Sequence, residues 1–113
     1  MVRTVTLNKQ MEIPIACDLD ALASAERERR RTLVRALAHA IVGRVELEHG
    51  FELRVDSARL DLPALAEWIG LERRCCPFLH FRVELAAGNG PVTVALSGGD
   101  GVKDFLLAEM GLS

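Results

Sequence analysis

The segment Glu72-Arg73-Arg74-Cys75-Cys76-Pro77-Phe78 holds the residues of this 113-residue sequence that are best suited to chemistry. Two cysteines are adjacent in it, and Cys17 is the only other cysteine of the chain. Thiolate sulfur is a soft ligand that favours Hg(II), As(III), Cu(I) or Zn(II) over Mg²⁺ and Ca²⁺. If the fold brings Cys17 beside Cys75 and Cys76, the three sulfurs form a candidate site for such an ion.

Three further side chains near the cysteines are candidates for supporting roles. Glu72 and Arg73 are expected to orient the ligands by hydrogen bonds, and His80 could add a nitrogen ligand for tetrahedral zinc. On an alternating strand, however, His80 lies opposite Leu79 and Phe81 and would point away from the core. For Glu72, a surface ion pair with Arg73 or another arginine is favoured over a role as a base beside a thiol.

The direction of the two adjacent sulfurs depends on where the helix before them ends. Neighbouring helical residues point about 100° apart, so Cys75 and Cys76 would diverge inside a helix. Pro77 biases Cys76 away from helical dihedral angles. If Cys76 is extended, its sulfur and the Cys75 sulfur can therefore converge on a third ligand.

Two other functions remain open for the cysteines. A redox or nucleophilic enzyme needs an exposed thiol of lowered pKa with a base nearby. The sequence offers Glu72 and His80 as the base. We expect such an enzyme less than an ion-binding module. Alternatively, the cysteines are buried filler in a structural or partner-binding domain. In that case the high apolar fraction of 50% leaves open a homodimer through a sheet edge or an apolar face.

Composition limits the remaining classes of function. The length predicts one domain over residues 1–113, large enough to fold without a metal or disulfide. A net charge of −2 argues against nucleic acid or an anionic membrane as partner, and no apolar run approaches the span of a bilayer. Three cysteines, two of them adjacent, do not form a secreted disulfide framework, and with no signal peptide in the sequence a cytoplasmic location is expected.

A helix and a hairpin are expected in the first half of the chain, after an extended edge segment over 11–16. Asp18, Asp20 and Ser24 are candidate N-caps of a helix that runs to about Val42 and ends at Gly43. The charge run over 26–31 in this helix is typical of a solvated face with local ion pairs. In the following hairpin, a three-residue loop over 48–50 would place Leu47 and Phe51 on one face, with Gly50 in the left-handed conformation.

The second half repeats this pattern of helix and hairpin. Asp61 and Pro63 begin a second helix that Pro77 ends. A second hairpin has a loop at 88–91, and a last helix runs from Gly101 to Met110, before Gly111. The expected inner stripe of the second helix comprises Leu62, Leu65, Ala66 and Ile69, with Trp68, Leu71 and Cys75 beside it. The order predicts an α+β fold, helix-hairpin-helix-hairpin-helix, with an antiparallel sheet and helices packed on one face.

The cysteine segment also resembles that of a known family. Residues 67–81, followed by 94–98 and 103–106, are similar to a family of small bacterial proteins that carry an E-R-x-C-C-P-F signature. Members commonly have an upstream cysteine where this chain has Cys17. The family is linked with mercury and other heavy-metal resistance. The resemblance therefore implies metal binding by Cys17, Cys75 and Cys76, with Glu72 and Arg73 as the flanking pair.

Overall fold

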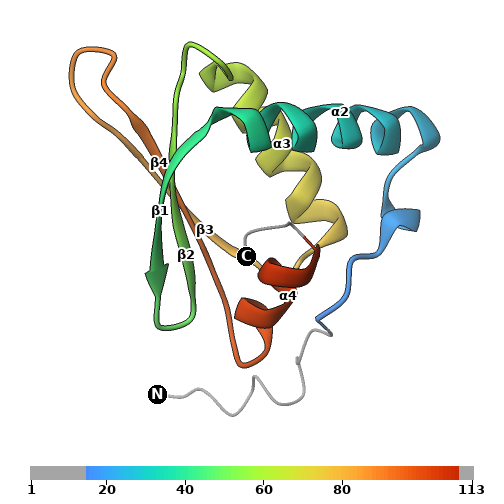
Figure 1. Cartoon of the computed structure of the whole chain (residues 1–113). Helices are drawn as coiled ribbons and strands as arrows, with labels where there is room; N and C mark the ends of the chain where they lie inside the picture. Colours follow the sequence, from blue (N-terminus) through green and yellow to red (C-terminus); the bar gives the residue numbers. More distant parts are fainter. Residues whose placement is uncertain (1–14, 110–113) are drawn as a thin grey trace, which may run out of the picture.

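A four-stranded antiparallel sheet with helices on one side forms the body of the molecule (Figure 1). The structure, a computed structural model, describes residues 15–109. The expected edge segment over 11–16 lies almost wholly outside these residues, as do Met110 and Gly111. The elements in chain order are η1 (Leu19–Ala21), α2 (Ser24–Ala40), β1 (Ile41–Leu47), β2 (Gly50–Val55), α3 (Leu62–Cys75), β3 (His80–Leu85), β4 (Val92–Ser97) and α4 (Val102–Glu109). The predicted α+β class and element order are confirmed.

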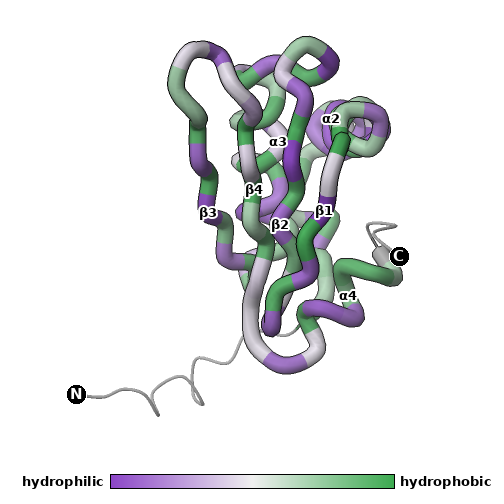
Figure 2. Tube along the Cα trace, turned by 60° about the vertical axis from the view of Figure 1, so that its left-hand side comes forward, coloured by the Kyte–Doolittle hydropathy of each residue, from purple (hydrophilic) through white to green (hydrophobic). Residues whose placement is uncertain are grey.

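The strand order in the sheet is β1-β2-β4-β3. Each hairpin pairs its own strands, and β2 pairs with β4 across the centre. Along β2, apolar residues that face the helices alternate with polar residues on the other face (Figure 2). In β4 the buried residues are Val92, Val94, Ala95 and Leu96. Within residues 15–109, no helix is long and apolar enough to cross a bilayer.

Local signals explain where the two long helices begin and end. The Asp61 carboxylate accepts a hydrogen bond from the Ala64 N–H, and Pro63 lies in the first turn of α3. This helix ends at Cys75, before Pro77, as predicted. The first long helix, α2, ends at Ala40, earlier than predicted, because the β-branched residues Ile41 and Val42 continue directly as strand β1. Gly43 is therefore a strand residue beside a bulge in β1 and not a helix terminator.

The predicted loop of the first hairpin is wrong. Leu47 pairs with Gly50 and Glu46 with Phe51, so the loop is the two-residue turn Glu48-His49. Gly50 has no positive φ angle; the positive-φ residues of the described chain are Gly88, Asn89 and Gly101. Consequently Val45 lies on the sheet face away from the helices, 54% exposed.

The helix-facing side of β1 is polar instead of apolar. Arg44 and Glu46 stand opposite Leu53 and Phe51. The Arg44 guanidinium lies 5.3 Å from the Phe51 ring centroid, and Lys103 of α4 forms an ion pair with Glu46 at 2.5 Å. Charged side chains thus cover this end of the core.

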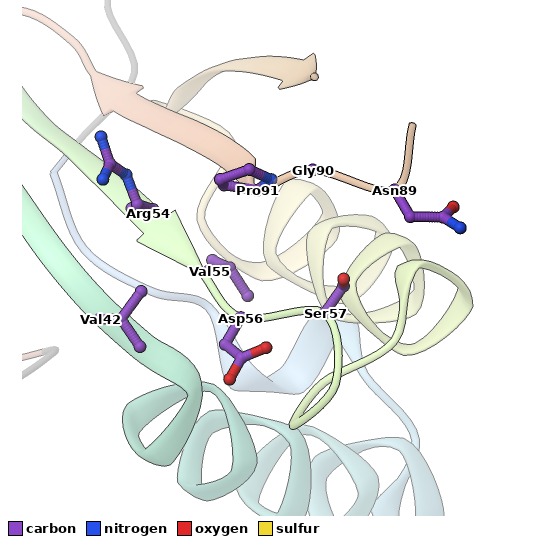
Figure 3. A pocket seen from close by; sticks show the side chains of 8 residues that line it. All are labelled: Val42, Arg54, Val55, Asp56, Ser57, Asn89, Gly90 and Pro91. Atoms are coloured by element: carbon purple, nitrogen blue, oxygen red, sulfur yellow. The ribbon is translucent and has the colours of Figure 1, made fainter. Parts of the chain in front are cut away.

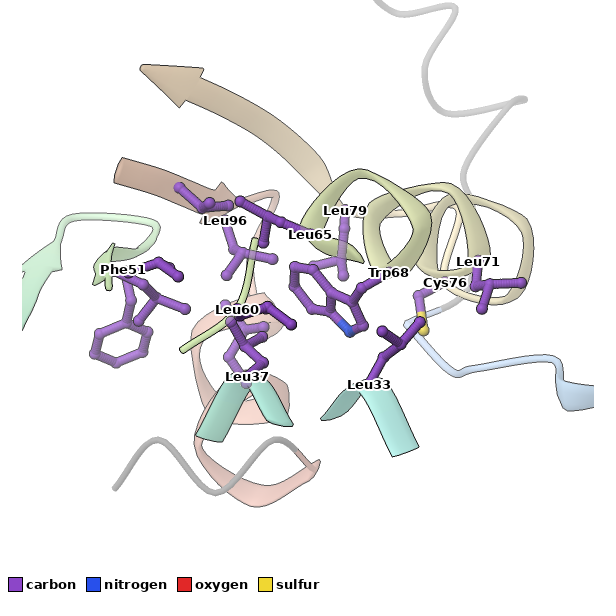
Figure 4. Close-up of a cluster of buried hydrophobic side chains, with 14 of the residues drawn as sticks. Leu33, Leu37, Phe51, Leu60, Leu65, Trp68, Leu71, Cys76, Leu79 and Leu96 are labelled. Carbon is purple, nitrogen blue, oxygen red and sulfur yellow. The ribbon is translucent and has the colours of Figure 1, made fainter. Parts of the chain in front are cut away.

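Trp68 of α3 lies at the centre of the core between the helices and the sheet (Figure 4). It is fully buried and meets Phe81 of β3 edge to face, with ring centroids 5.9 Å apart. The buried stripe of α3 is Leu65, Trp68, Leu71, Glu72 and Cys75. The predicted stripe is wrong at Leu62 and Ala66, which are exposed.

We expect Gly50→Ala to lower the free energy of unfolding by about 2–3 kcal/mol or more. A Cβ atom at Gly50 would overlap the Leu96 carbonyl oxygen and lie 2.7 Å from Ser97 Cα, because β2 and β4 approach closely here. Urea unfolding followed by circular dichroism measures the change.

Gly70→Ala is the matched control, since nothing lies within 4 Å of a Cβ atom at this helical position. It should stabilise the protein by about 0.5–1 kcal/mol. Equal effects of the two substitutions would contradict the close approach of Gly50 to β4.

Candidate functional site

The N-terminal end of the described chain meets the C-terminal end of α3 at the cysteines. Cys17 precedes η1, Cys75 is the last residue of α3, and Cys76 is the residue that caps it. A backbone hydrogen bond of 2.7 Å from Asp18 N to Cys75 O joins the two segments. Cys17 and Cys76, 59 residues apart in sequence, form a disulfide with their Cα atoms 4.6 Å apart. The condition that the sequence set for a shared site, Cys17 beside Cys75 and Cys76, is therefore met, although two of the three sulfurs are joined as a disulfide.

All three sulfur atoms lie within 4.8 Å of one another. The Cys75 and Cys76 sulfurs are 3.6 Å apart although the residues are neighbours. They converge because Cys76, with φ −126° and ψ 67°, has already left the helical conformation. The sequence left open whether the two sulfurs diverge or converge, and in the structure they converge.

The cysteine cluster reaches the surface at one member only. Cys75 and Cys76 are fully buried, and Cys17 is partly exposed. Figure 4 shows Cys76 at the edge of the leucine-rich cluster around Trp68, near Leu71. A reagent or ion from solvent would therefore meet Cys17 first.

Glu72 contacts the cysteine cluster from one turn earlier on α3. Its Oε1 atom lies 3.4 Å from the Cys76 sulfur, and the side chain is 1% exposed. Arg30 of α2 donates to both carboxylate oxygens, from Nε at 2.6 Å and from Nη2 at 3.3 Å. A buried carboxylate needs such a partner, because desolvation alone would make its charge very costly.

The surroundings of Cys75 favour its neutral thiol. Burial raises the pKa of Cys75, and the negative charge of Glu72 raises it further, while the Arg30 guanidinium acts in the opposite direction. A raised pKa leaves little thiolate at neutral pH. Cys75 is therefore poorly suited to act as a nucleophile in thiol chemistry.

The charge run of α2 connects the helix to α3 and is not merely a solvated face. Arg29 pairs with Glu67 at 2.8 Å and Arg74 with Glu26 at 2.6 Å, both between the two helices. These ion pairs border a surface groove of about 490 Å³ between α2 and α3. Since each charge already has a partner of opposite sign, the groove offers no free charge from these four residues.

The other predicted supporting residues lie outside the cluster contacts. Arg73 is exposed on α3, and His80 is exposed at the start of β3, opposite Ser97. His80 is not among the residues whose ligand atoms group with the three sulfurs. Of the residues predicted to support the site, only Glu72 contacts a sulfur.

Arg30 is the residue of the candidate site that the sequence did not point to. Glu72 could have been recognised as buried, because it follows Trp68 by four positions and precedes Cys75 by three, on the same face of α3. Its partner comes from 42 residues earlier in the chain. No local pattern distinguishes Arg30 from the arginines beside it in the charge run.

A second surface depression, of about 300 Å³, lies near the β3–β4 turn (Figure 3). Arg54 and Asp56 contribute its charged groups and point to different sides of it. Their side chains do not converge on one ligand position. The cysteine cluster is therefore the stronger candidate site.

Comparison of the chain with protein-family models, curated proteins and solved structures finds no match.

Arg30→Leu should lower the free energy of unfolding by about 3 kcal/mol, because it leaves the Glu72 carboxylate buried without its cation. The double variant Arg30→Leu/Glu72→Leu should recover most of this loss, since neither charge then remains. Arg29→Leu provides the matched control, because its pair with Glu67 is about half exposed. Chemical denaturation should show a much smaller loss for the control; equal losses would contradict the importance of burial.

With the disulfide intact, Cys75 should react with a maleimide at neutral pH at least about a hundredfold more slowly than in the denatured chain. Its sulfur is both fully buried and held as a thiol by its raised pKa. Labelling followed by mass spectrometry gives the rate. Rapid labelling of the folded protein at neutral pH would show that Cys75 is accessible and ionised.

Proposed function

We propose that the reduced protein binds a soft metal or metalloid ion through the thiolates of Cys17, Cys75 and Cys76. The grouping of all three sulfur atoms within 4.8 Å of one another carries this proposal. Two sulfurs bound to one ion at about 2.3 Å in tetrahedral geometry are separated by about 3.8 Å. The 3.6 Å between the sulfurs of Cys75 and Cys76 agrees with that separation.

Binding requires prior reduction of the Cys17–Cys76 disulfide. A dithiol or phosphine reductant supplies two electrons, the S–S bond breaks, and two protons complete the new thiols. The ion then displaces the protons of the thiols, because thiolate is the ligand. The disulfide thus represents an oxidised form in which two of the three ligands are occupied with each other.

Charge balance favours As(III) among the soft ions. Arsenous acid reacts with three thiols to give three As–S bonds and three water molecules, and the product carries no net charge. A divalent ion held by three thiolates would leave one negative charge in the buried cluster beside the Glu72 carboxylate. Arg30 already neutralises Glu72, so a neutral product avoids an uncompensated buried charge.

Two features support binding over the alternatives. The raised pKa of Cys75, caused first by burial, works against a nucleophilic thiolate at this residue. A structural disulfide accounts for the contact of Cys17 with Cys76, but it gives no role to the Cys75 thiol, whose sulfur lies 3.6 Å from that of Cys76. The resemblance of residues 67–81 to a family linked with heavy-metal resistance points in the same direction.

Titration of the phosphine-reduced protein with As(III), Hg(II) and Zn(II), followed by sulfur-to-metal absorbance, tests the proposal. We expect one ion per chain, As(III) bound with three protein thiols consumed, and no As(III) binding by the disulfide form. Each of Cys17→Ser, Cys75→Ser and Cys76→Ser should weaken As(III) binding by at least about tenfold, since each removes one of three bonds.

His80→Ala is the control for these variants, because the exposed imidazole is not grouped with the sulfurs. It should bind As(III) like the parent. If Cys75→Ser and Cys76→Ser also bind like the parent, the three-thiol site is wrong and the cysteines are structural.

A further inference from the structure

Among residues 15–109, β3 is an edge strand of the sheet, and one side of its backbone has no strand partner. Its only strand neighbour in the described sheet is β4. Ala86 N donates to Pro91 O at 3.3 Å, and this pair continues the ladder in which Glu84 faces Thr93 and Arg82 faces Ala95. In an antiparallel ladder, the backbone groups of alternate residues point to opposite sides. The N–H and C=O groups of Phe81, Val83 and Leu85 therefore point to the free edge.

The apolar side chains of this edge are exposed although they lie on the helix-facing side of the sheet. Val83 is 41% exposed and Leu85 55% exposed. They pair with the buried residues Val94 and Val92 on β4. Figure 1 shows the reason, because the β3–β4 hairpin projects away from α2 and α3 beyond the cover of the helices.

The charged side chains of β3, Arg82 and Glu84, lie on the face of the sheet away from the helices. Neither Arg82 nor Glu84 forms an ion pair with another described residue of the chain, and both are exposed. Exposed edges with free backbone groups and apolar side chains are prone to pair with another strand. An occupant of this edge should therefore bring apolar side chains on one face and opposite charges on the other.

A second copy of β3 meets this requirement in one antiparallel register. With Val83 on the two-fold axis, Phe81 faces Leu85 of the second copy, and Arg82 faces Glu84 of the second copy. The two-fold axis repeats each of these pairs, so two pairs of Arg82 with Glu84 form on one face. On the other face, two pairs of Phe81 with Leu85 flank the pair that Val83 makes with its own copy. The register also makes Phe81, Val83 and Leu85 the hydrogen-bonded positions, in agreement with the direction of their free backbone groups.

We propose that this chain forms a two-fold symmetric homodimer through antiparallel pairing of its β3 strands, which joins two sheets into one of eight strands. The interface is isologous, so it closes at two copies. This dimer is independent of the cysteine cluster, since Phe81, Arg82, Val83, Glu84 and Leu85 contribute no sulfur ligand.

The opposite edge strand, β1, is less suited to the same pairing. It repeats the residues Arg44-Val45-Glu46-Leu47 that occur on β3 as Arg82-Val83-Glu84-Leu85. On β1, however, Glu46 is engaged by Lys103, and Arg44 covers the Phe51 ring. A bulge between Ile41 and Gly43 also interrupts the strand. Bulged edges resist pairing because the ladder is locally broken.

Charge reversal on β3 tests the register directly. Arg82→Glu would place two glutamates of one copy against two of the other, and Glu84→Arg would do the same with arginines. Each variant should weaken dimerisation by at least about tenfold, because two favourable cross-strand pairs become repulsive. An equimolar mixture of the two variants should dimerise again, since glutamates then face arginines at both pairs.

Light scattering and sedimentation over a concentration series, on the reduced protein, measure the mass against the 12.4 kDa of one chain. Val83→Pro removes only an N–H that faces the free edge, so it should abolish the dimer and keep the circular dichroism of the parent. Val45→Lys, on the exposed face of β1, is the control and should leave the dimer unchanged.

The proposal is overturned if the parent is monomeric at every concentration. It is equally overturned if both charge reversals dimerise like the parent, or if the mixture of the two does not regain the dimer. Assemblies that grow beyond two copies would indicate pairing of β3 with β1 and would also overturn it.

Discussion

The ion pair between Arg30 and Glu72 is the interaction on which the arrangement of the helices depends. It lies between α2 and α3, and its carboxylate is almost completely removed from solvent. A buried charge tolerates little displacement of its partner. When the two charges separate, the buried one has neither water nor an opposite charge to stabilise it. The pair therefore adds a charged constraint to the apolar packing of α2 on α3. The exposed pairs of Arg29 with Glu67 and Arg74 with Glu26 lie along the same helix contact.

The cysteine cluster follows from this helix arrangement. The carboxylate that Arg30 holds in place contacts the Cys76 sulfur, and Cys76 ends the helix that Glu72 belongs to. The segment around Cys17 is attached there twice, by the disulfide and by the backbone hydrogen bond from Asp18 to Cys75. Chemistry at the sulfurs and the packing of the first helical segments on α3 are thus physically coupled. Reduction of the disulfide removes one of the two attachments and frees the ligands together.

The two edges of the sheet differ in how their charges are used. On β1, a two-residue turn directs Arg44 and Glu46 toward the helices, where Phe51 and Lys103 engage them. On β3, the equivalent tetrapeptide has its charges on the open face and its apolar residues beyond the reach of the helices. The same four residues therefore complete the core at one edge and leave a self-complementary strand at the other. Register decides which residues of each strand are on the helix-facing side, since a shift of one residue exchanges the faces of a strand. The projection of the β3–β4 hairpin beyond the helices then leaves Val83 and Leu85 exposed.

The sequence by itself determined the secondary structure order, the fold class and the identity of the three cysteines. Periodicity and local signals such as Asp61, Pro63 and Pro77 act over a few residues and can be recognised without the fold. The tertiary structure alone decided the turn at Glu48-His49, the pairing of Glu72 with Arg30 and the disulfide of Cys17 with Cys76. Gly50, which follows this turn, also packs against Leu96 of β4, and the other two contacts join residues 42 and 59 positions apart. Such contacts depend on where whole elements pack, which no local residue pattern encodes.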